Sequence, residues 1–162
     1  MVEDARFEDG DERPLRLQAV DEEDLKVIAA LVQDAVLPAS EMTWQKGRRR
    51  FAMLINRFRW EDRDAAEREG RKYERVRALL VVNDVFKVAL SGFDRRDADL
   101  VLSLLDITFE PGLEAPTGRV ILTLAGDGAI ALDVECLDVS LVDVTRPYVA
   151  PSGAVPMHKL DD

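Results

Sequence analysis

Short segments in which apolar and polar residues alternate recur through the second half of the chain. Leu105, Ile107 and Phe109 are separated by polar side chains, which is the pattern of a strand with one buried face. Residues 119–125 and 129–136 continue this alternation on either side of Gly126-Asp127-Gly128, a turn sequence in which glycine supplies a positive φ. Short strands joined by tight turns predict an antiparallel sheet.

The alternation changes phase once. Apolar residues occupy the even positions from 130 to 136 and the odd positions from 137 to 141, so the buried face switches near Cys136. A change of one residue inside a continuous pattern indicates a β-bulge or the corner of a barrel.

The first half predicts further strands. Residues 42–60 indicate a hairpin with a basic turn at Lys46-Gly47-Arg48, and residues 73–82 and 85–91 alternate as strands. Asn83-Asp84 between the last two is either a two-residue turn or a bend in one continuous strand. The charged residues 61–72 predict a solvated connection that can include a helical turn, and Asp94 is placed to cap a short helix over 94–101.

One main helix is predicted near the N-terminus, over residues 22–34. Asp21 is a suitable N-cap, three acidic residues follow in the first turn, and Leu25 and Ile28 lie at helical spacing. Val20 and Leu25 suit a hydrophobic staple.

Together these patterns predict an α+β fold, with about seven antiparallel strands in a curled sheet or partly open barrel packed on the N-terminal helix. The length of 162 residues fits one domain. Residues 1–14 are expected to form a flexible acidic tail, 15–150 the single domain, and 151–162 a proline-rich C-terminal tail.

Charge and cysteine content exclude several classes of function. A net charge of −10 argues against a general binder of DNA or of anionic membranes. The N-terminus has no signal sequence, no apolar run reaches the length of a membrane helix, and Cys136 is the single cysteine, so a cytoplasmic protein is expected. Residues 46–77 nevertheless hold 12 basic and 6 acidic side chains, which makes the chain charge-segregated.

Few catalytic arrangements are possible. The single histidine, His158, lies in the proline-rich tail, so histidine-based triads and the usual zinc sites lack their base or their ligands. The pKa of Cys136 should be raised by Glu135 and Asp138. Asp133 and Glu135 share one face of a strand, although a solvated outer face explains them more simply. The sequence predicts no cofactor and no metal, and it favours a function other than catalysis.

Four segments resemble an uncharacterised bacterial family, domain of unknown function 2948. They are Leu31–Val36, Phe51–Glu61, Leu102–Leu105 and Gly128–Cys136, and the likeness covers about residues 15–148. The resemblance implies no catalytic assignment. It directs attention to six polar or aromatic candidate site residues: Gln33, Asp34, Asn56, Arg57, Trp60 and Glu61.

Three functions follow as hypotheses. The first is a cytoplasmic module that binds another protein or a second copy of itself, since complementary charged regions favour association. The alternative is a small-ligand binder or weak enzyme that holds an anion around Asn56, Arg57 and Trp60. A second alternative is RNA binding through the basic hairpin 46–59. A structural interpretation of the same residues pairs Asp34 with Arg57 between helix and sheet.

Overall fold

The computed structural model describes residues 14–149 and 155–156, so most of the predicted tails 1–14 and 151–162 lies outside the described residues. The antiparallel α+β class is confirmed, but the predicted numbers are wrong. The described residues form eleven strands and two short α-helices, in place of about seven strands and one main helix. The strands are β1 (Arg16–Ala19), β2 (Val36–Pro38), β3 (Met42–Gln45), β4 (Arg50–Phe58), β5 (Glu74–Val82), β6 (Val85–Ser91), β7 (Val101–Pro111), β8 (Gly118–Leu124), β9 (Ala129–Val134), β10 (Val139–Asp143) and β11 (Tyr148–Val149).

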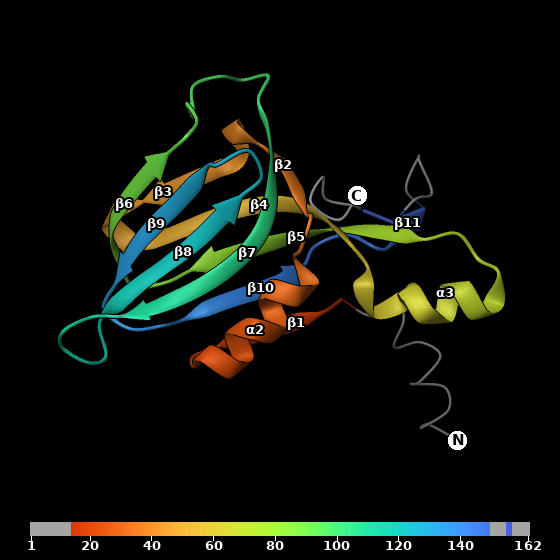
Figure 1. Ribbon diagram of the computed structural model, residues 1–162, viewed down its shortest axis with the longest axis horizontal. Helices are drawn as coiled ribbons and strands as arrows, with labels where there is room; N and C mark the ends of the chain where they lie inside the picture. Colours follow the sequence, from red (N-terminus) through yellow and green to blue (C-terminus); the bar gives the residue numbers. More distant parts are fainter. Residues whose placement is uncertain (1–13, 150–154, 157–162) are drawn as a thin grey trace.

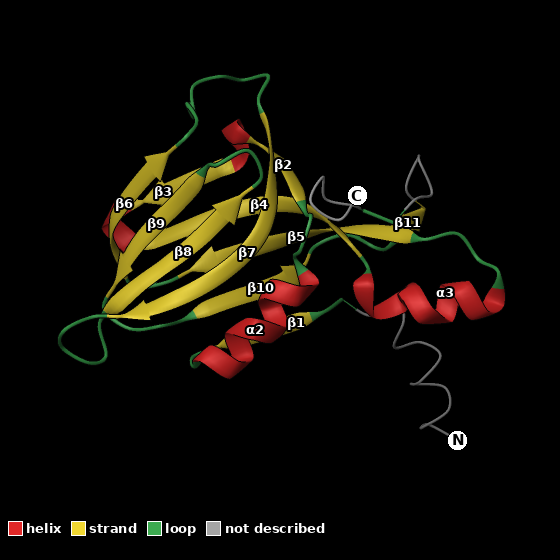
Figure 2. Cartoon of the chain, in the orientation of Figure 1, coloured by secondary structure: helices red, strands yellow, loops and turns green. Residues whose placement is uncertain are grey.

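All eleven strands belong to one open sheet (Figure 1). Their order is β1-β10-β5-β4-β2-β7-β8-β9-β6, with β3 added beside β4 and β11 beside β5. The predicted hairpins over 42–60 and around Gly126–Gly128 are present as β3–β4 and β8–β9. Figure 2 shows how little of the described chain is helical.

Residues Asn83 and Asp84 do not form a hairpin turn, because β6 pairs with β9 and not with β5. The chain bends there from one part of the sheet to another, with Asp84 at φ 58°. A second bend, between β9 and β10, lies against it: Asn83 N–H donates to Asp138 O at 2.9 Å and Glu135 N–H to Asp84 O at 3.0 Å. The change of phase at Cys136 marks this second bend.

The predicted N-terminal helix is α2 (Glu22–Leu31). Its cap is as expected, since the Asp21 carboxylate accepts from Asp24 N–H at 2.8 Å. The helix ends before residue 34 because Asp34 takes a positive φ of 63° and donates its N–H to Leu104 O at 2.7 Å. Val20, expected in a hydrophobic staple, is 60% exposed.

The charged segment 61–72 holds the second helix, which the sequence did not predict. A 3₁₀ turn η3 (Trp60–Asp62) leads into α3 (Arg63–Glu69), and Gly70 ends the helix in the left-handed conformation that glycine adopts most easily. The helix expected over 94–101 does not form, because the Asp94 and Asp97 carboxylates accept from the N–H groups of Arg96 and Asp99 and so stabilise turns.

A single hydrophobic core lies beneath α2 and between the strands, and it includes Leu25, Ile28, Leu80, Leu122 and Leu132. Helix α2 packs between β1 and β7 (Figure 1). No helix in the described part of the chain combines the length and hydropathy needed to cross a membrane.

Candidate functional site

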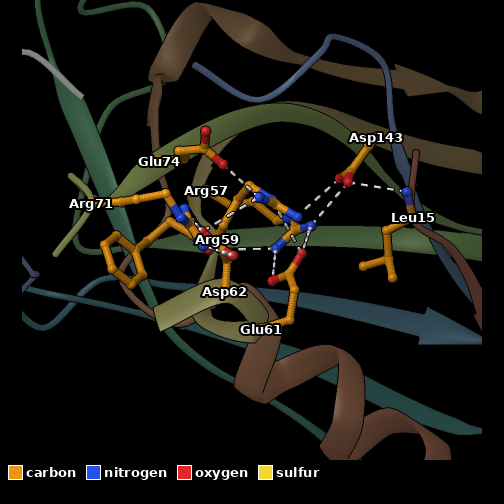
Figure 3. Close-up of polar contacts among 9 residues, drawn as sticks. Leu15, Arg57, Arg59, Glu61, Asp62, Arg71, Glu74 and Asp143 are labelled. Carbon is orange, nitrogen blue, oxygen red and sulfur yellow. Dashed lines mark hydrogen bonds and ion pairs between the residues drawn. The ribbon is translucent and has the colours of Figure 1, made fainter. Parts of the chain in front are cut away.

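Arg57 is fully buried in β4 and bonded at every donor (Figure 3). Its Nε and Nη2 donate to the Asp143 carboxylate at 3.0 and 2.9 Å, and its Nη1 and Nη2 donate to Glu61 at 2.9 and 2.7 Å. The second Nη1 hydrogen reaches Phe58 O at 3.4 Å. An arginine has five N–H groups, so Arg57 retains no donor for a ligand.

Electrostatics hold this group in its ionised form. Burial alone would lower the pKa of Arg57, but hydrogen bonds and the charges of Glu61 and Asp143 raise it above its ordinary value. Burial likewise raises the pKa of Glu61, and the bonds and charge of Arg57 outweigh it, so the net shift is downward. Asp143 also accepts from Leu15 N–H at 3.1 Å.

A second set of ion pairs adjoins the first. Arg59 donates to Glu74 at 2.6 Å and lies 3.7 Å from the Asp62 carboxylate. Arg71 donates to both Asp62 oxygens at 3.1 Å. We call the whole group the ion cluster; it consists of Arg57, Arg59, Glu61, Asp62, Arg71, Glu74 and Asp143 (Figure 3). Its members come from β4, η3, β5 and β10, from Arg59 between β4 and η3, and from the loop after α3, so it joins elements distant in sequence.

The other candidate residues surround the same end of β4. Asn56 donates to the Tyr148 hydroxyl at 2.5 Å and accepts from Arg75 Nε at 2.7 Å. Trp60 Nε1–H donates to Gln33 O at 2.9 Å, and its ring meets Phe58 edge-on with centroids 4.6 Å apart. These bonds place five of the six predicted residues in structural contacts.

The sixth, Asp34, differs from its predicted role. Asp34 is buried and its charge opposes the lowering of the Arg75 pKa by burial, while Arg57 takes Glu61 and Asp143 as its ionic partners. Sequence reasoning missed five members of the cluster, namely Arg59, Asp62, Arg71, Glu74 and Asp143. One signal for Arg59 was present in the sequence. The odd positions from 51 to 55 are apolar and predict a buried face, and Arg57 and Arg59 continue that face, so both would need buried partners.

The paired carboxylates singled out in the sequence have basic partners, and the basic hairpin is exposed only in part. Asp133 accepts from Arg119 at 2.7 Å, and Glu135 forms an ion pair with Arg49, so these carboxylates do not face one another as a catalytic pair. Arg57 and Arg59 are buried, which leaves the turn around Lys46 and Arg48 as the exposed part of the basic hairpin.

A different region has the shape of a binding site. Strand β7 pairs with β8 from Leu104 to Pro111, but it pairs with β2 only from Val101 to Ser103. In the part of the chain that the structure describes, no strand pairs with residues 105–111 on their other side. That edge faces α2 (Figure 1).

A row of hollows follows the line along which α2 packs against this edge, and we call it the α2–β7 groove. One hollow of about 320 Å³ lies between Lys26, Ala30 and Gln33 of the helix region and Leu105 and Asp106 of the strand. The next, about 200 Å³, lies between Glu22, Leu25 and Lys26 and residues 107–109. The hollows are lined by consecutive residues of β7, whose side chains point to opposite faces of the sheet. The groove therefore follows the edge of the strand and not one of its faces.

The groove ends in a larger cavity of about 490 Å³. Apolar side chains form much of its wall, including Val20, Phe109, Pro111 and Leu137. Glu22 and Phe109 line both this cavity and the neighbouring hollow, so the two adjoin one another. The α2–β7 groove and its end cavity therefore combine apolar walls with a few polar groups.

Cys136 also lines the end cavity. Its thiol donates to the Asp84 carboxylate at 3.2 Å. That hydrogen bond, then burial and the negative charges of Asp84, Asp138 and Glu135, raise the thiol pKa above its ordinary value of 9.0. The predicted direction is confirmed, and a thiol in this state is a poor nucleophile at neutral pH.

Comparison with known proteins places the chain in one group. The family model described as "Protein of unknown function (DUF2948)" matches residues 15–158. No curated protein and no solved structure matches the chain.

Proposed function

The chain belongs to the DUF2948 family of proteins of unknown function, and from that premise we propose that it is a protein-interaction module that binds an extended segment of a partner in the α2–β7 groove. The observation that carries the proposal is the edge of β7 between Leu105 and Pro111, which pairs with no described strand on the side where α2 packs. An unpaired edge offers backbone N–H and C=O groups to an added strand, and the neighbouring hollows accept its side chains.

The geometry limits what can bind. Residues 105–111 of an extended strand span roughly 23 Å, which suits a segment of about seven residues. The floor and end of the groove are apolar, through Leu25, Ile107 and Phe109, and its rim is polar. Backbone pairing would supply affinity and the hollows would select side chains on alternate positions.

The experiment fills the groove from the helix side. Ala30 is exposed and lines the hollow beside Leu105, so Ala30→Trp should block it. Val27 is also exposed on α2 but lines none of the hollows described above, which makes Val27→Trp a matched control. Random peptides of about ten residues, selected on the full chain, should bind Val27→Trp as they bind the unaltered protein and should bind Ala30→Trp weakly. Recovery of no peptides, or equal binding to both variants, would refute the proposal.

Anion binding is a second candidate, centred on Arg75 instead of Arg57. Arg75 is half-buried, and its Nε and Nη2 donate to the side-chain and backbone oxygens of Asn56 at 2.7 and 3.0 Å. Burial lowers the pKa of Arg75 despite the negative charge of Asp34. An arginine hydrogen-bonded to an amide keeps charge available for an anion. Calorimetric titration with inorganic phosphate tests this candidate. Arg75→Gln should abolish the heat of binding. Arg77→Gln, a control at an exposed position of β5, should retain it. Absence of binding to the unaltered chain would rule it out.

A further inference from the structure

We infer that the segment bound in the α2–β7 groove is cationic, with Lys or Arg alternating with aliphatic residues, and that it displaces the Asp106 carboxylate from the N–H of Ile107. The inference rests on the proposed function and specifies the partner.

The first support is the way β7 protects its own edge. Asp106 Oδ1 accepts from Ile107 N–H at 2.8 Å, so this N–H bonds to a side chain and not to β8. Hydrogen bonding alternates between the two sides of an antiparallel strand, which places the N–H and C=O of Ile107 and Phe109 on the groove side. Asp106 therefore caps a donor that an added strand would use, as charged residues commonly do at sheet edges.

The second support is the charge around the groove. Its lining includes the carboxylates of Asp21, Glu22, Asp106 and Asp138, against one ammonium, Lys26. Opposite charges raise both the rate and the specificity of association. A lysine or arginine of the incoming segment would hold the Asp106 carboxylate in its displaced position while a carbonyl of that segment takes the Ile107 N–H.

Charge argues against the N-terminal segment of this chain as the occupant. Residues 1–13 carry six acidic and two basic side chains, so like charges would repel that segment from the groove. A second copy could offer its basic turn at Lys46 and Arg48. The experiment below distinguishes that case from a separate partner.

Three labelled peptides of about seven residues test the inference by fluorescence anisotropy on the full chain. The first alternates valine with arginine, the second alternates valine with glutamate, and the third repeats the first with N-methylated valines. The arginine peptide should bind, and its glutamate counterpart should not. The N-methylated peptide should bind far more weakly, since it keeps the side chains but loses the N–H donors that pair with β7.

Variants locate the interaction. Asp106→Asn keeps an acceptor for Ile107 N–H but loses the charge, and should weaken binding of the arginine peptide about threefold. Asp106→Lys should weaken it further. Glu23→Lys is the matched control, because Glu23 is exposed on α2 beside Glu22 yet lines none of the hollows described above; it should leave binding nearly unchanged.

The outcomes separate the two claims. If the arginine and glutamate peptides bind equally and both need their N–H donors, the groove pairs with strands but the inference of a cationic partner is wrong. If neither binds, the proposed function fails with it. If the chain sediments as a dimer that Asp106→Lys dissociates, the occupant is a second copy and the inference of a separate partner is overturned.

Discussion

Arg57 and Asp143 are joined by two hydrogen bonds, of 3.0 and 2.9 Å, although 86 residues separate them in the sequence. Both side chains are buried, at 0% and 5% exposure. Their pairing brings the end of β4 to the end of β10, and Asp143 in turn accepts from Leu15 N–H just before β1. The ion cluster therefore links three parts of the sheet by side chains.

Removing the carboxylate should destabilise the fold strongly. Asp143→Ala leaves the buried guanidinium of Arg57 with Glu61 as its remaining ionic partner. Removing one member of a buried ion pair lowers the free energy of unfolding by about 3 kcal/mol or more. Urea denaturation followed by circular dichroism should show a lower midpoint with an unchanged slope. Asp133→Ala, which breaks the exposed pair with Arg119, serves as the control and should shift the midpoint little. Equal shifts for the two variants would show that the cluster has no special role.

The stability of the fold should decrease as the pH is lowered into the acid range, partly because Glu61 becomes protonated. The pKa of Glu61 in the folded chain lies below its ordinary 4.5, so the ionised group stabilises the fold above that pH, and this contribution is lost as the pH falls through the lower, folded value. Glu61→Gln should therefore be less stable than the unaltered chain at pH 7, and the difference should shrink under acid conditions. Unfolding measured across that range checks the trend. A difference that stays constant with pH would contradict it.

Gly118, at the start of β8, has no room for a side chain. An added Cβ would lie 2.6 Å from Glu110 O and would overlap the Phe109 ring. Gly118→Ala should cost about 1–3 kcal/mol of stability through overpacking. Because Phe109 lines the α2–β7 groove, this variant should also weaken peptide binding. Gly47→Ala, with nothing within 4 Å of the added atom, is the control and should be nearly neutral in a thermal melt.

Cys136 should react slowly with an aromatic disulfide reagent at neutral pH, since its raised pKa keeps the thiol protonated. Asp84→Asn removes the largest cause of that shift and should accelerate the reaction. Asp138→Asn removes a weaker, purely electrostatic contribution and should accelerate it less. The rate of thiolate release at a fixed pH gives the comparison, and an unchanged rate in Asp84→Asn would show that the hydrogen bond does not control the pKa.

Much of the secondary structure could be predicted from local pattern. Asp21 begins α2 because its short carboxylate satisfies a free N–H of the first turn. The alternation at Leu105, Ile107 and Phe109 identified β7, and the glycines around Asp127 identified the β8–β9 turn. Each depends on residues within a few positions of one another.

What local pattern could not predict is which distant strands meet. The segment Asn83-Asp84 has the composition of a hairpin turn, but β6 finds its partner in β9, so the chain bends instead. Helix α3 was missed because a single residue, Ala66, is buried on it and no apolar period marks it. Arg57 was rightly identified as a residue in need of partners, yet Asp143 could be found only from the packing of β10 beside β5.

The distance in sequence between Arg57 and Asp143 has a consequence during synthesis. Arg57 is synthesised 86 residues before Asp143, its partner. Leu15, whose N–H donates to the same carboxylate, is synthesised 128 residues before it. Until β10 emerges, burying β4 would enclose an undercompensated cation, which opposes early collapse around that strand. The nascent chain should therefore remain open to chaperones and proteases until β10 is made, and then close in one cooperative step.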